Sequence, residues 1–181
     1  SSLADIIQFD TRKPKGTEHL HELIKAIKAR QIISFLYESF ERPGRFVVEI
    51  EPFALKEFKS RWYLIGREVK SGNIKTYGLD RIEEISISLV KFQYPVDFQL
   101  KEYFKHSFGI FIIQDDYPME VLLSFDIQTA KYILTMPLHP SQEVVQESED
   151  EVLISLKLYL TPDFLSEILS YGEKVKVLKP Q

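Results

Sequence analysis

Five short stretches with strand-like alternation follow one helical pattern within about 75 residues, and this crowding limits the fold more than any other feature of the sequence. The helical pattern covers residues 17–29, where apolar residues recur at the spacing of one helix face and Thr17 is the expected N-cap. The five alternating stretches are residues 31–37, 45–58, 61–69, 75–79 and 82–89. So many strands in so short a chain leave no room for a two-sheet sandwich, so a small closed barrel is expected. Pro52 removes a ladder donor, which predicts a bulge or an edge position in the second strand.

The second half of the chain has a different order of expected strands and helices. Strands are expected at residues 119–125, 139–147, 152–160 and 174–178, and helices at residues 126–137 and 161–172. Asp126 and Thr161 are the expected N-caps, with Pro162 at a first helical position and Gly172 as a helix stop. The order βαββαβ is the ferredoxin-like pattern. The fold class is therefore α+β.

These patterns divide the chain into two domains. We expect an N-terminal linker at residues 1–16, the barrel domain at 17–92, a linker with a short helix near residues 99–105 at 93–118, and the ferredoxin-like domain at 119–181. Because the first residue is Ser rather than Met, we expect the chain to be part of a longer protein. No apolar run is long enough to span a membrane and no secretory signal is visible, so a cytoplasmic location is expected.

Charge separates the two halves of the chain. Residues 12–91 contain sixteen Lys and Arg against eleven Asp and Glu, a net charge of +5, whereas residues 92–181 contain seven Lys against fourteen acids, a net charge of −7. All seven Arg lie in the first half, and Arg is suited to bidentate contacts with phosphate or carboxylate. An anionic partner for the first half is one interpretation, and solvated strand edges are the other.

The stretch from Arg61 to Ile82 carries an aromatic and cationic pattern on adjacent strands. Alternation places Arg61, Tyr63 and Arg67 on one face of the third strand, with Trp62 and Leu64 on the other face as core residues. Exposed aromatic rings and guanidinium groups are what a single-stranded nucleic acid or a nucleotide requires, since rings stack on bases and Arg binds phosphate. The candidate ligand-binding residues are Tyr37, Arg61, Tyr63, Arg67, Tyr77 and Arg81.

This site requires the phenol and guanidinium groups to stay accessible on the outside of the barrel. Packing of Tyr63 and Tyr77 on a half-buried sheet surface is the competing interpretation. For Arg81, an ion pair with Asp80, Glu83 or Glu84 competes with a ligand.

Several motifs in the first half make residues 17–90 resemble a WYL domain. They are the triplet Trp62-Tyr63-Leu64, the pair Ala26-Ile27 that ends the helix, Tyr37, Glu51-Pro52 and the run Leu79-Asp80-Arg81-Ile82. Residues 119–180, with HPSQ at 139–142 and ILSYGEKVKVLKP at 168–180, similarly resemble the companion extension called WCX. One departure is Gly78, because the commoner family pattern has a basic residue there, and Arg67 or Lys75 is a possible substitute.

The resemblance implies a function as well as a fold. WYL domains are SH3-like or Sm-like barrels that sense a ligand, usually within a bacterial transcription regulator whose DNA-binding helix-turn-helix precedes the barrel. The residues before Gly16 are too few for a helix-turn-helix, so DNA is expected to bind a domain absent from this chain. The resemblance favours a ligand role for Arg81.

Signals for an enzyme are weak. No nucleophile, acid–base or phosphate-loop pattern is found, His19 and His21 do not have metal-ligand spacing, and Cys is absent, so we expect no catalytic residues, no metal and no cofactor. The leading hypothesis is a ligand-sensing regulatory region that binds a nucleic acid or nucleotide-like anionic effector on the barrel and forms a homodimer. The alternative is a dimerisation module that binds other proteins and has no such ligand.

Overall fold

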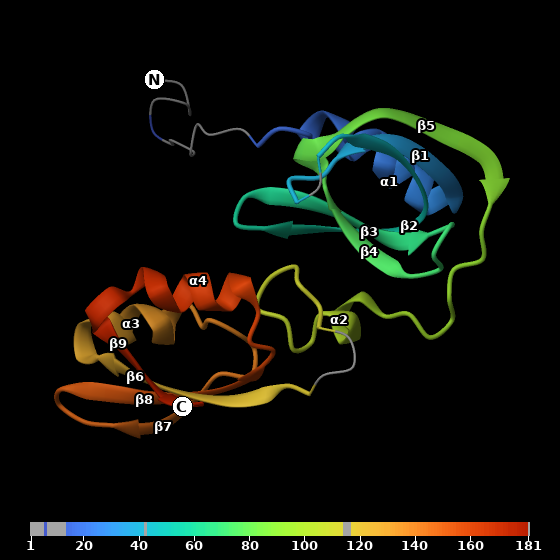
Figure 1. Cartoon of the computed structure of the whole chain (residues 1–181). Coiled ribbons are helices and arrows are strands. Elements are labelled where there is room, and N and C mark those ends of the chain that lie inside the picture. The colour runs from blue at the N-terminus through green and yellow to red at the C-terminus, as the bar shows by residue number, and fades with distance from the viewer. Residues whose placement is uncertain (1–5, 7–13, 42, 114–116, 181) are drawn as a thin grey trace. The chain divides into compact units, whose positions relative to one another are not determined.

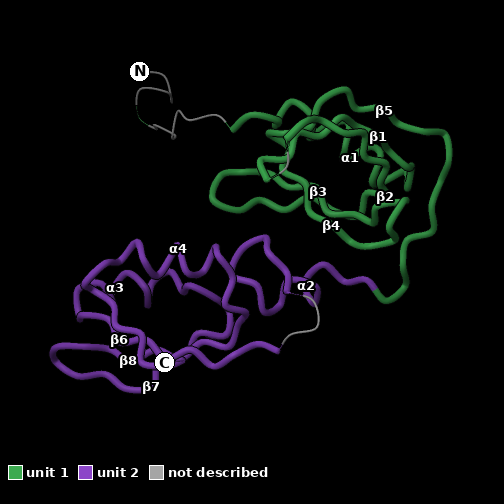
Figure 2. Tube along the Cα trace, viewed as in Figure 1, with its two compact units in different colours: residues 1–97 green, residues 98–181 purple. Residues whose placement is uncertain are grey.

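A computed structural model describes residues 6, 14–41, 43–113 and 117–180 of the chain. The chain is a mixed α+β protein with two antiparallel sheets. It forms two compact units, unit 1 at residues 1–97 and unit 2 at residues 98–181 (Figure 2). Among the described residues, no helix combines the length and the apolar character needed to cross a membrane.

Unit 1 is a five-stranded sheet folded around one helix (Figure 1). Its strands pair in the order β4-β3-β2-β1-β5, and all its pairings are antiparallel. Its elements are η2 (Thr17–His19), α1 (Leu20–Ala29), β1 (Gln31–Glu38), β2 (Arg45–Phe58), β3 (Arg61–Glu68), β4 (Ile74–Gly78), η3 (Leu79–Arg81) and β5 (Ile82–Lys91). The order of helix and strands agrees with the sequence pattern.

The core of unit 1 joins the apolar face of α1 to one face of the strands. Leu23 and Ala26 from the helix are fully buried, as their helical spacing predicts. They pack in one cluster with residues of β1, β2, β3 and β4, namely Ile33, Phe35, Tyr37, Val48, Ile50, Leu64 and Tyr77, and with Leu79 and Ile82. Trp62 packs against this cluster while remaining partly exposed.

Two local predictions for unit 1 have different outcomes. The register of β2 against β3 shifts between Pro52 and Ala54, which confirms the bulge expected at the proline. The prediction that Thr17 caps the first helix is wrong. Its hydroxyl donates to the carbonyl of Pro14 at 3.3 Å, and the first turn is a short 3-10 helix whose N-cap position is occupied by Gly16.

Unit 2 is a four-stranded antiparallel sheet with two helices on one face (Figure 1). The strand order is β7-β8-β6-β9. Its elements are α2 (Leu100–Tyr103), β6 (Met119–Asp126), α3 (Ile127–Thr135), β7 (Glu143–Glu147), β8 (Glu151–Leu158), α4 (Pro162–Ser170), η4 (Gly172–Lys174) and β9 (Val175–Lys179). Alternate residues of β6 and β8 face the helices and form the core with Ala130, Ile133, Phe164 and Ile168.

Both predicted N-caps in unit 2 are confirmed. The Asp126 carboxylate accepts hydrogen bonds from the backbone N–H groups of Gln128 and Thr129, each at 3.0 Å. The Thr161 hydroxyl accepts from the backbone N–H of Phe164 at 3.4 Å, with Pro162 at the first helical position. These residue types satisfy backbone donors that a helix leaves unpaired at its first turn.

Part of the segment expected to be a linker packs on unit 2. The ring of Phe108 meets that of Phe164 edge-on at 5.7 Å, and the backbone N–H of Ile110 donates to Asp163 at 3.0 Å. The carbonyl of His106 accepts from the N–H of Tyr159 at 2.8 Å. The physical units thus divide between residues 97 and 98, whereas the domain boundaries given above remain predictions.

Candidate functional site

The three tyrosines of the predicted site are buried in unit 1. Tyr37, Tyr63 and Tyr77 are 6%, 8% and 5% exposed, respectively. The rings of Tyr37 and Tyr77 meet edge-to-face at 5.0 Å, and Phe35 meets Tyr77 in the same way at 5.3 Å. Such pairs stabilise a core by about 0.5–1.5 kcal/mol beyond the area they bury. The expectation of an accessible tyrosine surface is therefore wrong in this structure.

The reason is that both faces of β3 are covered. Tyr63, Leu64, Ile65 and Gly66 are buried in succession, although alternation predicted one solvated face. On the face of Arg67, the rings of Phe92 and Tyr94 lie 5.8 and 5.2 Å from the ring of Phe53 in β2. Arg67 lies 5.9 Å from the same Phe53 ring. The chain that follows β5 therefore returns over this face, and period-two alternation does not reveal such a tertiary contact.

The tyrosine hydroxyls belong to internal hydrogen bonds. The Tyr37 hydroxyl accepts from the backbone N–H of Gly78 at 3.4 Å, and the Tyr77 hydroxyl donates to Glu68 at 3.3 Å. Burial raises the pKa of Tyr37, and burial together with the Glu68 carboxylate raises the pKa of Tyr77. Lys75 donates to the same carboxylate at 2.6 Å and is the main cause of the lowered pKa of Glu68. Lys75 is thus engaged by an internal acid.

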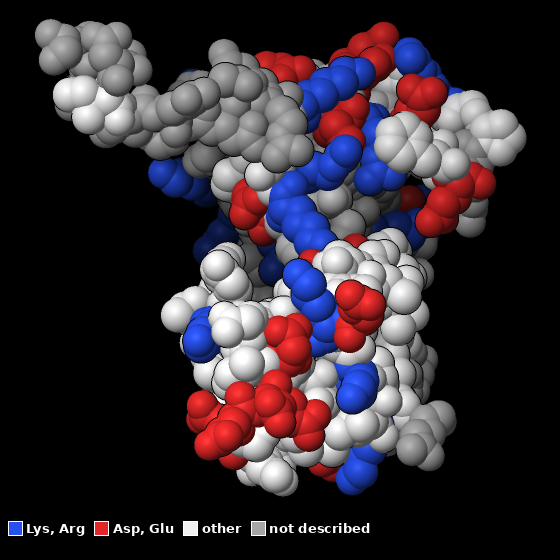
Figure 3. Space-filling view, turned by 90° about the vertical axis from the view of Figure 1, so that its left-hand side faces the viewer, with Lys and Arg blue, Asp and Glu red and all other residues white. Residues whose placement is uncertain are grey.

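Each of the three predicted arginines is paired with a carboxylate. Arg61 donates to Asp80 at 2.6 Å, and Arg67 donates to Glu51 at 2.6 Å. The Nε atom of Arg81 lies 3.5 Å from the other oxygen of Asp80. Of the three acids considered as partners of Arg81, the structure selects Asp80. On the face shown in Figure 3, basic side chains likewise lie directly beside acidic ones.

Arg61 and Arg81 converge, whereas Arg67 lies apart. Arg61 and Arg67 stand at opposite ends of β3, six residues or about 20 Å apart along an extended strand. Arg61 is at the end that pairs with β4 near Gly78, next to η3, which carries Asp80 and Arg81. One carboxylate therefore joins two guanidinium groups at this end of the sheet.

The Arg81 guanidinium lies in an aromatic and polar environment. Its central carbon is 5.4 Å from the Tyr37 ring centroid and 4.8 Å from that of Phe40. The side chain is 22% exposed, and its buried Nε has no hydrogen-bond partner within the described residues. Since 3.5 Å is at the outer limit of a hydrogen bond, the ion pair with Asp80 leaves this donor poorly satisfied. The ring of Phe40, in contrast, is 75% exposed in the loop after β1.

Gly78 makes room for this arrangement. A Cβ atom on Gly78 would lie 2.5 Å from the Asp80 carboxylate and 2.6 Å from an Arg81 nitrogen. The absence of the expected basic residue at this position therefore allows Asp80 and Arg81 to fold back over the backbone. The sequence pattern indicates Asp80 as a residue of the WYL motif and a competing partner of Arg81, not as part of the ligand site, and it does not indicate Phe40. A single exposed Phe in a loop carries no periodic signal.

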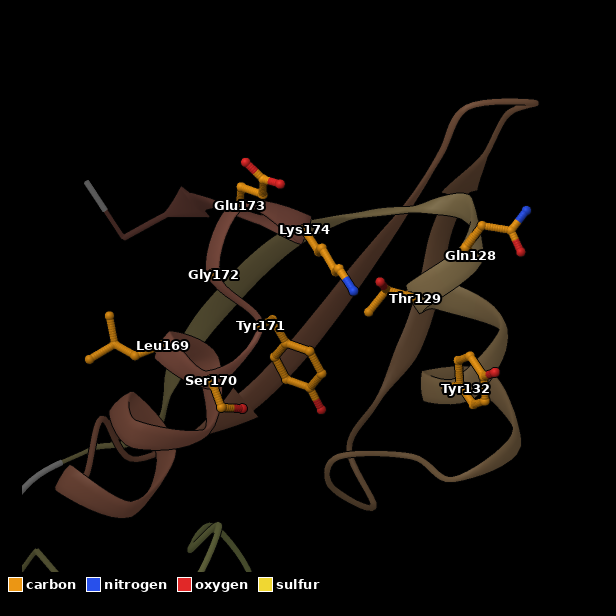
Figure 4. Close-up of a pocket in the computed structure, with 9 residues that line it drawn as sticks. All are labelled: Gln128, Thr129, Tyr132, Leu169, Ser170, Tyr171, Gly172, Glu173 and Lys174. Carbon is orange, nitrogen blue, oxygen red and sulfur yellow. The ribbon is translucent and has the colours of Figure 1, made fainter.

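A groove in unit 2 was not predicted from the sequence. It has a volume of about 570 Å³ and lies between α3 and the end of α4 (Figure 4). Its lining residues are Gln128, Thr129, Tyr132, Leu169, Ser170, Tyr171, Gly172, Glu173 and Lys174. Burial, together with a hydrogen bond of 3.0 Å to Glu167, raises the pKa of Tyr171 to about 12. Across the described part of the chain, no three His, Cys, Asp or Glu are grouped so as to hold a metal ion.

Comparison with known proteins gives two family matches. The WYL domain model matches residues 18–87, and the WCX domain model matches residues 117–181. A search of curated protein sequences found no match.

Two solved structures are similar to this chain over most of its length. One is proteasome accessory factor B/C (PafBC) of Arthrobacter aurescens, with 22% identity, a TM-score of 0.48, and coverage of 93% of this chain and 25% of that one. The other is described as a CRISPR Cas-related protein, with 14% identity, a TM-score of 0.55, and coverage of 94% and 51%. This chain thus spans about a quarter and a half of their respective lengths.

Proposed function

Because the chain belongs to the proteins in which a WYL domain is followed by a WCX domain, we propose that it is the ligand-sensing region of a transcription regulator. In this proposal, unit 1 is the SH3-like or Sm-like barrel. The support for this assignment is the five-stranded antiparallel sheet whose core cluster includes α1. Unit 2 is the ferredoxin-like domain, supported by the element order β6-α3-β7-β8-α4-β9 and the strand order β7-β8-β6-β9. DNA is bound by a domain outside this chain, and the role is regulatory rather than catalytic.

The observation that carries the ligand proposal is the convergence of Arg61 and Arg81 beside the exposed ring of Phe40. Two guanidinium groups sharing one carboxylate carry a net charge of +1, so the cluster attracts an anion. Arg binds phosphate through paired N–H donors, and an exposed aromatic ring accepts a base by stacking. The effector class is therefore a single-stranded nucleic acid or a nucleotide. Of the residues predicted from sequence, Arg61 and Arg81 contact the ligand in this proposal, and the buried Tyr37 supports Arg81.

Direct binding tests this proposal. Labelled single-stranded DNA, labelled RNA and a panel of linear and cyclic nucleotides are titrated against the chain at two salt concentrations. We expect at least one ligand to bind and its affinity to fall as salt rises, because phosphate contacts release counterions. The variant Arg61→Ala is expected to weaken binding more than the matched control Arg45→Ala, whose arginine pairs with Glu38 and Glu83 on the same unit. Absence of binding by every ligand contradicts the proposed effector class.

A second candidate function rests on unit 2. Exposed apolar side chains lie on the two helices at a spacing of four residues. They are Tyr132 and Met136 on α3 and at its end, and Leu165 and Leu169 on α4. Tyr132 and Leu169 also line the groove (Figure 4). Such a surface fits a protein partner, and a second copy of the chain would make the protein a homodimer. Light scattering of the wild type and of Leu169→Glu tests this, with a change from dimer to monomer as the expected result. A monomeric wild type at high concentration contradicts the dimer.

A further inference from the structure

The Asp80 carboxylate contacts both Arg61 and Arg81, and this position suggests how the proposed ligand site of unit 1 discriminates between ligands. We infer that Asp80 is an internal anion occupying Arg61 and Arg81, which an effector displaces, so that the site selects ligands with several phosphates over singly charged ones. This inference rests on the proposed function, because it concerns the same two arginines. It adds the specificity of the site and the residue that determines it.

The contacts of Asp80 divide its carboxylate between the two cations. Its Oδ2 accepts from Arg61 at 2.6 Å, while its Oδ1 lies 3.5 Å from Nε of Arg81. The Asp80 side chain is 16% exposed, whereas Arg61 is 60% exposed. The carboxylate therefore stands between an arginine open to solvent and one that is largely buried. An anion that reached both guanidinium groups would have to take its position.

The two halves of this contact differ in quality. The bond to Arg61 has the length of a strong charge-assisted hydrogen bond, whereas 3.5 Å to Arg81 is longer than the 2.7–2.9 Å usual for such a bond. Nε of Arg81 is buried and makes no hydrogen bond to any described residue, so a phosphate oxygen would satisfy a donor that Asp80 leaves unsatisfied. Exchange of Asp80 for a phosphate therefore improves the contact on the Arg81 side.

Displacement of Asp80 is opposed by its attachment to the chain. The Asp80 carboxylate lies on the same short helix as Arg81, so its effective concentration at the arginines is high. A dilute, singly charged anion therefore competes poorly with it for these arginines. A strand of nucleotides presents consecutive phosphates, so a second phosphate can bind nearby while the first replaces Asp80. The site thus discriminates by the number of charges on the ligand.

Gly78 explains why Asp80 can occupy this position. Its backbone is in the extended region, at φ −68° and ψ 129°, so the glycine is not required by its conformation. A side chain there would instead collide with the Asp80 carboxylate and with Arg81. The space over residue 78 is therefore filled by the internal ion pair.

The variant Asp80→Asn tests the inference, because Asn keeps the shape of the side chain and removes its charge. The probes are a ten-nucleotide single strand of thymidines and the singly charged 3′,5′-cyclic AMP, both titrated against wild type, Asp80→Asn and the control Glu83→Gln. Glu83 is another carboxylate of unit 1 paired with an arginine, Arg45, so its substitution matches the change in net charge.

We expect Asp80→Asn to bind cyclic AMP roughly fivefold more tightly than wild type, the upper range for one partly exposed ion pair. For the oligonucleotide we also expect a gain in affinity, since no carboxylate then has to be displaced before its phosphates reach the two arginines. Glu83→Gln should change neither quantity. Unchanged or weaker binding of both probes by Asp80→Asn overturns the inference. Failure of every variant, wild type included, to bind either probe instead contradicts the proposed function.

A measurement on the wild-type chain is independent of how well the variant folds. The carboxyl ¹³C signal of Asp80 and the Nε–H signal of Arg81 are followed by NMR as the oligonucleotide is added to saturation. We expect both signals to move together, because the carboxylate leaves as the phosphate arrives. Movement of the Arg81 signal with the Asp80 signal unchanged shows that the carboxylate stays in place, which overturns the inference.

Discussion

Because His139 is buried, we expect the stability of unit 2 to depend on pH. Its ring accepts a hydrogen bond from the backbone N–H of Ser141 at 3.1 Å, and it lies 2.8 Å from the Ser141 hydroxyl. The same hydroxyl bonds to the N–H of Lys157 in β8 at 2.9 Å, so the turn is attached to the sheet through this neutral ring. Burial is the main cause of the lowered pKa of His139, and the charge of His106 lowers this pKa further. A hydrogen bond to the backbone of Lys105 acts in the opposite direction and raises it.

The sign of the effect follows from proton binding. Because the folded pKa of His139 is below the ordinary value of 6.5, the unfolded chain binds its proton first as the pH falls. The contribution to stability is therefore complete above pH 6.5 and is lost as the pH falls from there towards the folded pKa. One proton corresponds to a slope of at most about 1.4 kcal/mol per pH unit within this window.

Urea unfolding of the whole chain between pH 8 and pH 5 measures this effect, with circular dichroism reporting both units. Trp62 is the single tryptophan and lies in unit 1, so its fluorescence provides an internal reference. In His139→Asn the amide can accept the Ser141 N–H but cannot titrate. We expect this variant to have a free energy of unfolding about 1–3 kcal/mol lower than wild type at pH 8, because its buried hydrogen bonds are altered. Its stability should also change less with pH than that of wild type. The exposed His21→Asn is the matched control. Parallel pH profiles for wild type and His139→Asn would refute the reasoning.

Three further predictions concern stability. Tyr77→Phe removes only the hydroxyl that bonds Glu68, so we expect the free energy of unfolding to fall by about 0.5–1.5 kcal/mol. Tyr77→Ala also removes the buried ring and should lower it by about 3–5 kcal/mol. Both values are read from Trp62 fluorescence during urea unfolding. A larger loss for the Phe variant than for the Ala variant would exclude a packing role for the ring. Thr161→Ala should cost about 1 kcal/mol by loss of the α4 cap, measured by circular dichroism, and a Ser variant should recover most of it. Gly16→Ala should destabilise unit 1 by at least about 1 kcal/mol in thermal unfolding, because φ is +91° and a Cβ would lie 2.2 Å from the Leu79 carbonyl oxygen. The control Gly72→Ala has a positive φ but open space around the Cβ, so it separates backbone strain from the steric clash.

The local elements of this protein could be predicted because they depend on neighbours in the chain. Apolar spacing placed α1 and the strands, the proline at position 52 placed a bulge, and Asp126 and Thr161 capped the helices that follow them. Each of these effects is short-ranged, since a strand period, a missing N–H or a cap acts within a few residues. The WYL and WCX motifs were recognisable for the same reason.

The composition of the ligand site, in contrast, was decided by contacts between distant segments. Alternation predicts neither that Phe92 and Tyr94 return against Phe53 nor that Tyr63, expected on a solvated face, is buried. Several acids were near Arg81 in sequence, and only the fold of η3 against β3 gave it Asp80 together with Arg61. Burial and ion pairing depend on which chain segments meet in space, and no periodicity along one strand carries that information.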